Sequence, residues 1–171
     1  MRRIMIFGGP GSGKSTLARA VGARLGLPVV HMDHLYWAPG WVERPREVVR
    51  RMALARIADD DWVFDGNHSS TFDARAERAD LIVYLDVPRH VRIARILRRT
   101  ALSYGRVRPD MGPGCPEQFD PSFVFGFAWR YAGAPRDRAM AFLDRWRGRR
   151  PIRILGRGAT VIRFLNGLPS A

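Results

Sequence analysis

The stretch Gly8-Gly9-Pro10-Gly11-Ser12-Gly13-Lys14-Ser15-Thr16 decides the fold of this 171-residue chain. From Gly8 to Ser15 it spells G-x-x-x-x-G-K-[ST], a loop whose backbone N–H groups surround phosphates. Glycine lets the backbone approach an anion closely, and the N-terminus of the helix that follows adds partial positive charge. We therefore expect residues 8–16 to bind the phosphates of a nucleotide, with the Ser15 hydroxyl also binding Mg²⁺.

Lys14 is the only lysine in a sequence with 28 arginines. The arginine guanidinium is a broad planar fork, whereas the lysine ammonium is a compact point charge that fits inside a tight loop. A source that otherwise uses arginine for positive charge thus keeps lysine where the geometry requires it. We expect Lys14 to act catalytically on the β- and γ-phosphates.

Short apolar runs alternate with helical patterns along the whole chain. The expected strands are 3–7, 28–32, 62–64, 81–86 and 151–155. The expected helices are 15–25, 45–58, 71–79, 88–102, 122–147 and 159–165, and residues 33–44 are expected to form a loop rich in aromatic side chains. This alternation predicts an α/β fold with a mainly parallel sheet.

Residues 103–121 interrupt the alternation with glycine or proline at six positions before Pro121. Such a segment is typical of a loop or a mobile lid. The length of the chain suits one domain, so we expect a single domain over residues 1–171 with 103–121 as its lid segment.

The formal net charge is +13, and two explanations stay open. One is compositional bias toward arginine, and the other is a surface that binds polyanions, which makes nucleic acid a possible partner. No apolar run approaches the roughly 20 residues of a membrane-spanning helix, so no membrane partner is expected. Cys115 is the only cysteine, which excludes an internal disulfide. These features favour a soluble, cytoplasmic protein.

Three aspartates directly follow expected strands: Asp33, Asp65 and Asp86. Ligands of parallel sheets gather beyond the carboxyl ends of the strands, so all three side chains are expected near the nucleotide. Apolar residues followed by Asp65 resemble a Walker B strand, which makes Asp65 the candidate Mg²⁺ ligand beside Ser15. Asp33 is the candidate for orienting or deprotonating the acceptor. Asp86 precedes Val87-Pro88 and is interpreted either as a nucleotide-facing carboxylate or as a cap of the next helix.

His31 and His34 flank Asp33, but no cysteine or third histidine is near them in sequence, so a zinc site is disfavoured. Three aromatic residues of the same region are interpreted either as walls of an acceptor pocket or as ordinary packing. They are Tyr36, Trp37 and Trp41.

Arginines are frequent in the expected helix 88–102 and in the lid segment. They form either a solvated basic face or a clamp on the transferring phosphoryl group. Arg95 and Arg99 are the candidate catalytic arginines. Arg75 is interpreted either as a ligand of an anionic acceptor or as a surface residue of its helix.

The motifs GGPGSGKST, HMDHLYW, DGN, ADLIVYLDVPR and GCPE together resemble the P-loop kinase-like proteins of the DNA topology modulation (FlaR-type) family, which are similar to adenylate kinase. The resemblance implies a P-loop NTPase built as a three-layer sandwich, with a five-stranded parallel sheet in the order 2-3-1-4-5. It also implies ATP and Mg²⁺ as cofactors and a mobile lid. Asp-Gly-Asn replaces the Asp-Gly-Phe-Pro-Arg of true adenylate kinases, and no stretch matches their AMP-binding region.

These observations predict an ATP-dependent kinase that phosphorylates a small molecule or a nucleotide. Two alternatives remain. One is an ATPase or regulator associated with nucleic acid, and the other is a nucleotide-binding switch with little turnover.

Overall fold

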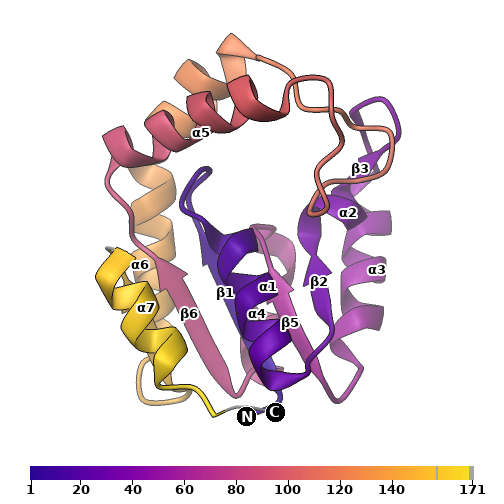
Figure 1. The fold of residues 1–171 in the computed structure, drawn as a ribbon. Helices are drawn as coiled ribbons and strands as arrows, with labels where there is room; N and C mark the ends of the chain where they lie inside the picture. Colours follow the sequence, from indigo (N-terminus) through magenta and orange to yellow (C-terminus); the bar gives the residue numbers. More distant parts are fainter. Residues whose placement is uncertain (157, 170–171) are drawn as a thin grey trace.

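A five-stranded parallel sheet forms the centre of the computed structural model, which describes residues 1–156 and 158–169 (Figure 1). Its strands are β1 (Arg3–Gly8), β2 (Val29–His31), β5 (Trp62–Asp65), β6 (Leu81–Leu85) and β7 (Ile152–Leu155). Their spatial order is β2-β5-β1-β6-β7. Counted along the chain within this sheet, the order is 2-3-1-4-5, as the sequence resemblance implies.

Alternate residues of β1 point to opposite faces of the sheet, and this alternation builds two cores. Met5 and Phe7 pack beneath α3 (Arg46–Ile57), α4 (Phe72–Arg78) and α6 (Ala134–Trp146). Ile4 and Ile6 pack on the opposite face against α1 (Lys14–Leu25) and α7 (Gly158–Asn166). The result is the expected three-layer sandwich.

Helix α5 (Arg89–Ser103) lies across the carboxyl ends of the strands (Figure 1). The lid segment follows it and arches toward the far edge of the sheet, where it lies beside β3. It contains two isolated β-bridges, Tyr104 with Glu117 and Val107 with Pro116. The carboxyl edge of the sheet is therefore covered from above by α5 and the lid segment.

Two expected elements differ in the structure. The expected loop 33–44 contains a short helix α2 (Met32–Tyr36) and a hairpin of β3 (Trp37–Ala38) and β4 (Val42–Glu43). The expected helix 122–147 is broken into the π-helix η2 (Ser122–Ala128) and α6. Pro135, at the start of α6, has no N–H for a continuous helix, and the chain turns between the two helices.

Candidate functional site

The loop between β1 and α1 has the backbone that its glycines permit. Gly11 and Gly13 have φ angles of +74° and +94°, a region that other residues rarely adopt. A Cβ on Gly11 would also lie 2.4 Å from the Arg92 carbonyl oxygen. Gly13 directly precedes α1, so the N-terminus of this 12-residue helix opens onto the loop. This geometry is that of an anion-binding P-loop.

Arginines of α5 donate to carbonyl oxygens of the P-loop. Arg92 is buried, and its Nη1 donates to Pro10 at 3.1 Å and to Ala128 at 3.2 Å. Arg95 Nη1 donates to the Ser12 carbonyl at 3.0 Å. The hydrogen bonds from α5 to the Pro10 and Ser12 carbonyls hold the loop rigidly. Arg95 thus lies at the P-loop as expected, and its contact with phosphate stays a prediction.

Asn67 ties the turn after β5 to the beginning of the P-loop. Its Nδ2 donates to the Gly8 carbonyl at 2.8 Å, and its Oδ1 accepts from the Gly8 N–H at 3.3 Å. Sequence reasoning quoted the Asp-Gly-Asn turn but assigned Asn67 no role. The sequence feature that could have indicated a role for Asn67 is its position, because its amide side chain comes shortly after β5, the strand that pairs with β1.

Asp65 ends β5 and is 2% exposed. Its Oδ2 lies 2.8 Å from the Nδ1 of His31, the residue paired with it on β2. Its Oδ1 has no hydrogen-bond partner among the described residues. Asp65 therefore offers one carboxylate oxygen that is free to bind a cation.

Asp33 lies at the start of α2, close enough to Lys14 and Asp65 for their charges to act on it. Burial raises the pKa of the Asp33 carboxyl, and the negative charge of Asp65 adds to this rise. Lys14 and Arg108 act against it. The structure thus brings together three of the predicted site residues, Lys14, Asp33 and Asp65.

The oxygen atoms of Asp65 and Ser15 suit Mg²⁺, which binds partly through substrate phosphates, better than a metal that is bound by protein side chains alone. Among the residues that the structure describes, no group of three or more His, Cys, Asp or Glu side chains is placed to hold a metal. Mg²⁺ is usually bound by one or two carboxylates together with substrate phosphates. The free oxygen of Asp65 and the partly buried Ser15 suit that arrangement.

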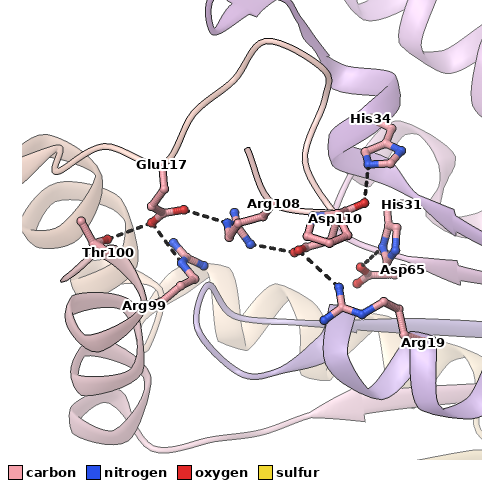
Figure 2. A network of polar contacts seen from close by, with 10 residues as sticks. Arg19, His31, His34, Asp65, Arg99, Thr100, Arg108, Asp110 and Glu117 are labelled. Atoms are coloured by element: carbon pink, nitrogen blue, oxygen red, sulfur yellow. Dashed lines mark hydrogen bonds and ion pairs between the residues drawn. The ribbon is translucent and has the colours of Figure 1, made fainter. Parts of the chain in front are cut away.

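The guanidinium of Arg99 is paired with a carboxylate of the lid segment. Its Nε donates to Oε1 of Glu117 in the lid segment at 3.0 Å. Arg108 donates to Oε2 of the same carboxylate at 2.7 Å and to Asp110 at 2.7 Å, and Asp110 also pairs with Arg19 of α1 (Figure 2). The sequence analysis did not single out Glu117 or Asp110. The feature that could have indicated them is their position as acidic residues within an arginine-rich segment.

The same pairing governs the pKa of Asp110. Burial acts to raise it, but Arg108 and Arg19 stabilise the ionised form and the pKa is lowered overall. Figure 2 shows Arg108 between the two carboxylates. The lid segment is therefore held to both α5 and α1 by ion pairs whose carboxylates are buried.

The tip of the lid segment is bonded to the β3–β4 hairpin. Trp41 Nε1 donates to the Pro116 carbonyl at 3.0 Å, and Gly40 N donates to the Gly114 carbonyl at 2.9 Å. The Cys115 thiol is 1% exposed and donates to the Ala38 carbonyl at 3.2 Å. Trp41 therefore has a structural contact, and a role of the aromatic residues in an acceptor pocket stays a prediction.

Two sequence interpretations are wrong. Asp86 does not cap α5, because its carboxylate forms two hydrogen bonds with Arg136, at 2.9 and 2.6 Å. Arg75 is neither a surface residue nor exposed to an acceptor. It is fully buried and donates to the carbonyls of Gly66 and His68. A cavity of about 240 Å³ lies beside the pair of Asp86 and Arg136.

None of the described helices is both long and apolar enough to cross a membrane. No curated protein matches the sequence. In structure, the chain is similar to a gluconokinase from Sinorhizobium meliloti 1021, with a TM-score of 0.55 and 19% identity over 96% of this chain and 94% of that one. It is also similar to a deoxyadenosine kinase from M. mycoides, with a TM-score of 0.51 and 14% identity over 96% of each chain.

These two likenesses concern the fold, which is that of P-loop kinases. The sequence matches the AAA domain family over residues 4–106, from β1 through the P-loop and α5 into the lid segment. The resemblance to the DNA topology modulation proteins is not confirmed by this match. The P-loop, the parallel sheet around it and the family match lead to one conclusion: the chain belongs to the AAA domain family and has the fold of a P-loop kinase.

Proposed function

We propose that this protein transfers the terminal phosphoryl group of ATP to a hydroxyl group of a small-molecule or nucleotide acceptor. The observation that carries the proposal is that Asp33, at the start of α2, lies close enough to Lys14 of the P-loop for the ammonium charge to act on its carboxyl. Phosphoryl transfer needs a cation on the phosphates and a group that receives the proton of the acceptor. Lys14 and Asp33 supply these two parts.

The raised pKa of Asp33 supports its assignment as the base. Burial is the main cause of the rise, so the carboxylate is a stronger base than an exposed aspartate. A base is most effective when its pKa approaches the working pH. The charge of Lys14 acts in the opposite direction and limits this rise.

The reaction follows from these roles. Backbone N–H groups of residues 8–16 and the ammonium of Lys14 hold the β- and γ-phosphates. Asp33 accepts the proton of the acceptor hydroxyl while the oxygen of that hydroxyl forms a bond to the γ-phosphorus. The bond from that phosphorus to the bridging oxygen then breaks, and ADP leaves with the electron pair. Arg95 and Arg99 stabilise negative charge on the phosphoryl oxygens.

Ser15 and Asp65 are the residues that would hold Mg²⁺. When bound, the ion neutralises charge on the phosphate oxygens. The lid segment excludes water from the transferring group, which favours transfer to the acceptor over hydrolysis of ATP.

The test is ADP release from Mg-ATP by the purified protein and by Lys14→Ala, against a panel of acceptors. The panel contains nucleoside monophosphates, nucleosides, hydroxylated metabolites and duplex DNA. We expect one small-molecule class to stimulate the wild type and no acceptor to stimulate Lys14→Ala. Normal ATP binding without stimulation by any acceptor would overturn the proposal and favour a switch.

The net charge of +13 keeps nucleic acid as a second candidate partner. Binding through phosphate contacts releases counterions, so the affinity for DNA would fall steeply with salt. Stimulation of ADP release by DNA alone, lost between low salt and about 150 mM, would favour a nucleic-acid-associated ATPase.

A further inference from the structure

We infer that His31 is a positioning residue for the Mg²⁺ carboxylate of Asp65. It binds one oxygen of this carboxylate and thereby directs the other toward the phosphates. The inference rests on the proposed function, because Asp65 serves the metal only in a nucleotide-binding site. His31 entered the sequence analysis only as a disfavoured zinc ligand.

The fold itself brings the two side chains together. His31 is the last residue of β2, and Asp65 is the last residue of β5. The two residues are direct partners in the parallel pairing of these strands. The register of the sheet thus fixes the pair at the carboxyl edge, with Asp65 on the strand next to β1 and His31 on the strand beyond it.

The contact is short and buried. His31 Nδ1 lies 2.8 Å from Asp65 Oδ2, and the two residues are 7% and 2% exposed (Figure 2). An ionised carboxylate offers only acceptors, so the proton of this hydrogen bond is on Nδ1 of the imidazole. The bond therefore sets both the orientation of the carboxylate and the ring nitrogen that carries hydrogen.

The second oxygen of Asp65 has no partner in the part of the chain that the structure describes. Oδ1 is buried and has no hydrogen-bond partner among the described residues. Leaving a buried charged acceptor unpaired is unfavourable, and such atoms are retained where a ligand or ion completes them. Asp65 also lies close enough to Asp33 for its charge to act on that carboxyl, as the charge of Lys14 of the P-loop does.

Other roles for His31 fit these contacts less well. A zinc ligand needs further protein donors, and the described residues provide no group of three. A base for the acceptor would act through Nε2, so the test below measures the Mg²⁺ dependence of nucleotide binding, which a base role would leave unchanged. Residues that orient a metal ligand typically alter metal affinity or activity 10–100-fold when they are mutated.

The experiment compares two substitutions of His31. In His31→Asn, the side-chain amide keeps a donor near the position of Nδ1, whereas His31→Leu fills the site without a donor. His90→Leu is the matched control, because His90 is an exposed histidine at the start of α5. The readout is the affinity for a fluorescent ATP analogue, measured over a series of Mg²⁺ concentrations and in EDTA, with thermal melting to confirm folding.

We expect the Mg²⁺ concentration needed for half-maximal binding to rise about 10-fold or more in His31→Leu. It should stay near the wild-type value in His31→Asn and His90→Leu, and binding in EDTA should be equal in all four proteins. Unchanged Mg²⁺ dependence in His31→Leu would overturn the inference. An equal loss in both His31 variants would also overturn it, because ring packing rather than the hydrogen bond would then be responsible.

A second measurement covers the case in which His31→Leu does not fold. His31→Ala, which also lacks the donor, is then compared in the wild-type and the Asp65→Asn backgrounds. His31→Ala should raise the Mg²⁺ requirement only while Asp65 is present, and either no effect in the wild-type background or an equal effect in the Asp65→Asn background would overturn the inference. Wild-type protein whose nucleotide binding ignores Mg²⁺ would instead count against the proposed function.

Discussion

Asn67 and Gly8 exchange two hydrogen bonds across 59 residues of sequence, with the Asn67 amide both donating to and accepting from the Gly8 backbone. This pair joins the turn that follows Asp65 to the first residue of the P-loop. The amide of Asn67 therefore adds a side-chain link between the turn after β5 and the P-loop to the backbone pairing of β5 with β1.

The first prediction concerns Asn67→Ala. We expect the affinity for ATP to fall about tenfold, because a P-loop without this tie must be ordered by the nucleotide itself. The unpaired backbone groups of Gly8 should also lower the free energy of unfolding by about 1–3 kcal/mol. Calorimetric titration and chemical denaturation measure the two effects. Asn166→Ala, at an exposed position, is the control, and equal behaviour of the two variants would contradict the prediction.

The second prediction is that Asp33→Asn stabilises the protein while it removes activity. Burial raises the pKa of Asp33 in the folded state, so this group favours folding only below its unfolded pKa. That contribution is lost as the pH rises through the folded pKa, and the ionised side chain is unfavourable at pH 7. We expect a higher Tm at pH 7 and a kcat lower by about 10²–10⁴-fold.

The control for this substitution is Asp59→Asn, because Asp59 is exposed at the end of α3. We expect it to change neither the Tm nor kcat. A lower Tm in Asp33→Asn would show that its contact with Lys14 outweighs the cost of burial.

The third prediction is the pH dependence of transfer. Asp33 acts as a base only when it is ionised, and its pKa is raised. The rate should therefore fall with acid at a pH above the ordinary aspartate pKa of about 3.9. The measurement is kcat/KM against pH at saturating Mg²⁺. An acid limb at or below the ordinary value would remove Asp33 as the base.

The fourth prediction separates two adjacent arginines of α5. Arg99 faces Glu117 above the P-loop, whereas Arg98 is exposed. We expect Arg99→Ala to lower kcat at least about 10³-fold, since an arginine on the transferring phosphoryl group contributes on that scale. Arg98→Ala should retain wild-type kcat. Equal rates for the two variants would assign Arg99 to the lid contact alone.

The fifth prediction uses the only cysteine of the chain as a reporter. Cys115 is 1% exposed between the lid segment and the β3–β4 hairpin, so a thiol reagent should label it slowly in the native protein. Trp41→Phe removes the donor to Pro116 and should speed labelling several-fold, because local opening becomes easier. Equal rates for wild type and Trp41→Phe would show that this hydrogen bond does not hold the lid segment closed.

The sheet and its P-loop were predictable because each rests on a local pattern. The apolar run 3–7 stops at Gly8, and the motif that follows has its own required geometry. The break between η2 and α6 was not predicted, although Gly133 lies within it and Pro135 is the second residue of α6. The apolar and arginine spacing on both sides is helical and hides the turn, in which the Tyr131 ring lies against Gly9 of the P-loop.

The partners of charged side chains were the least predictable part of the site. Arg75 and Arg92 look like surface residues of helices in sequence, yet both are buried and donate to backbone carbonyls. Their partners lie on other segments, up to 82 residues away. The spacing of residues along the chain does not reveal these partners, because the contacts form only when α4 and α5 pack against the sheet.

The bonds between the lid segment and the β3–β4 hairpin have a kinetic consequence. Under the proposed function, the lid segment covers the ATP side and the hairpin flanks the acceptor side, and the two are joined by Trp41 and Gly40. We therefore expect the two segments to open together during turnover in the wild type, so that a single opening event admits both substrates and frees both products. The viscosity dependence of turnover should accordingly be the same whichever substrate is saturating.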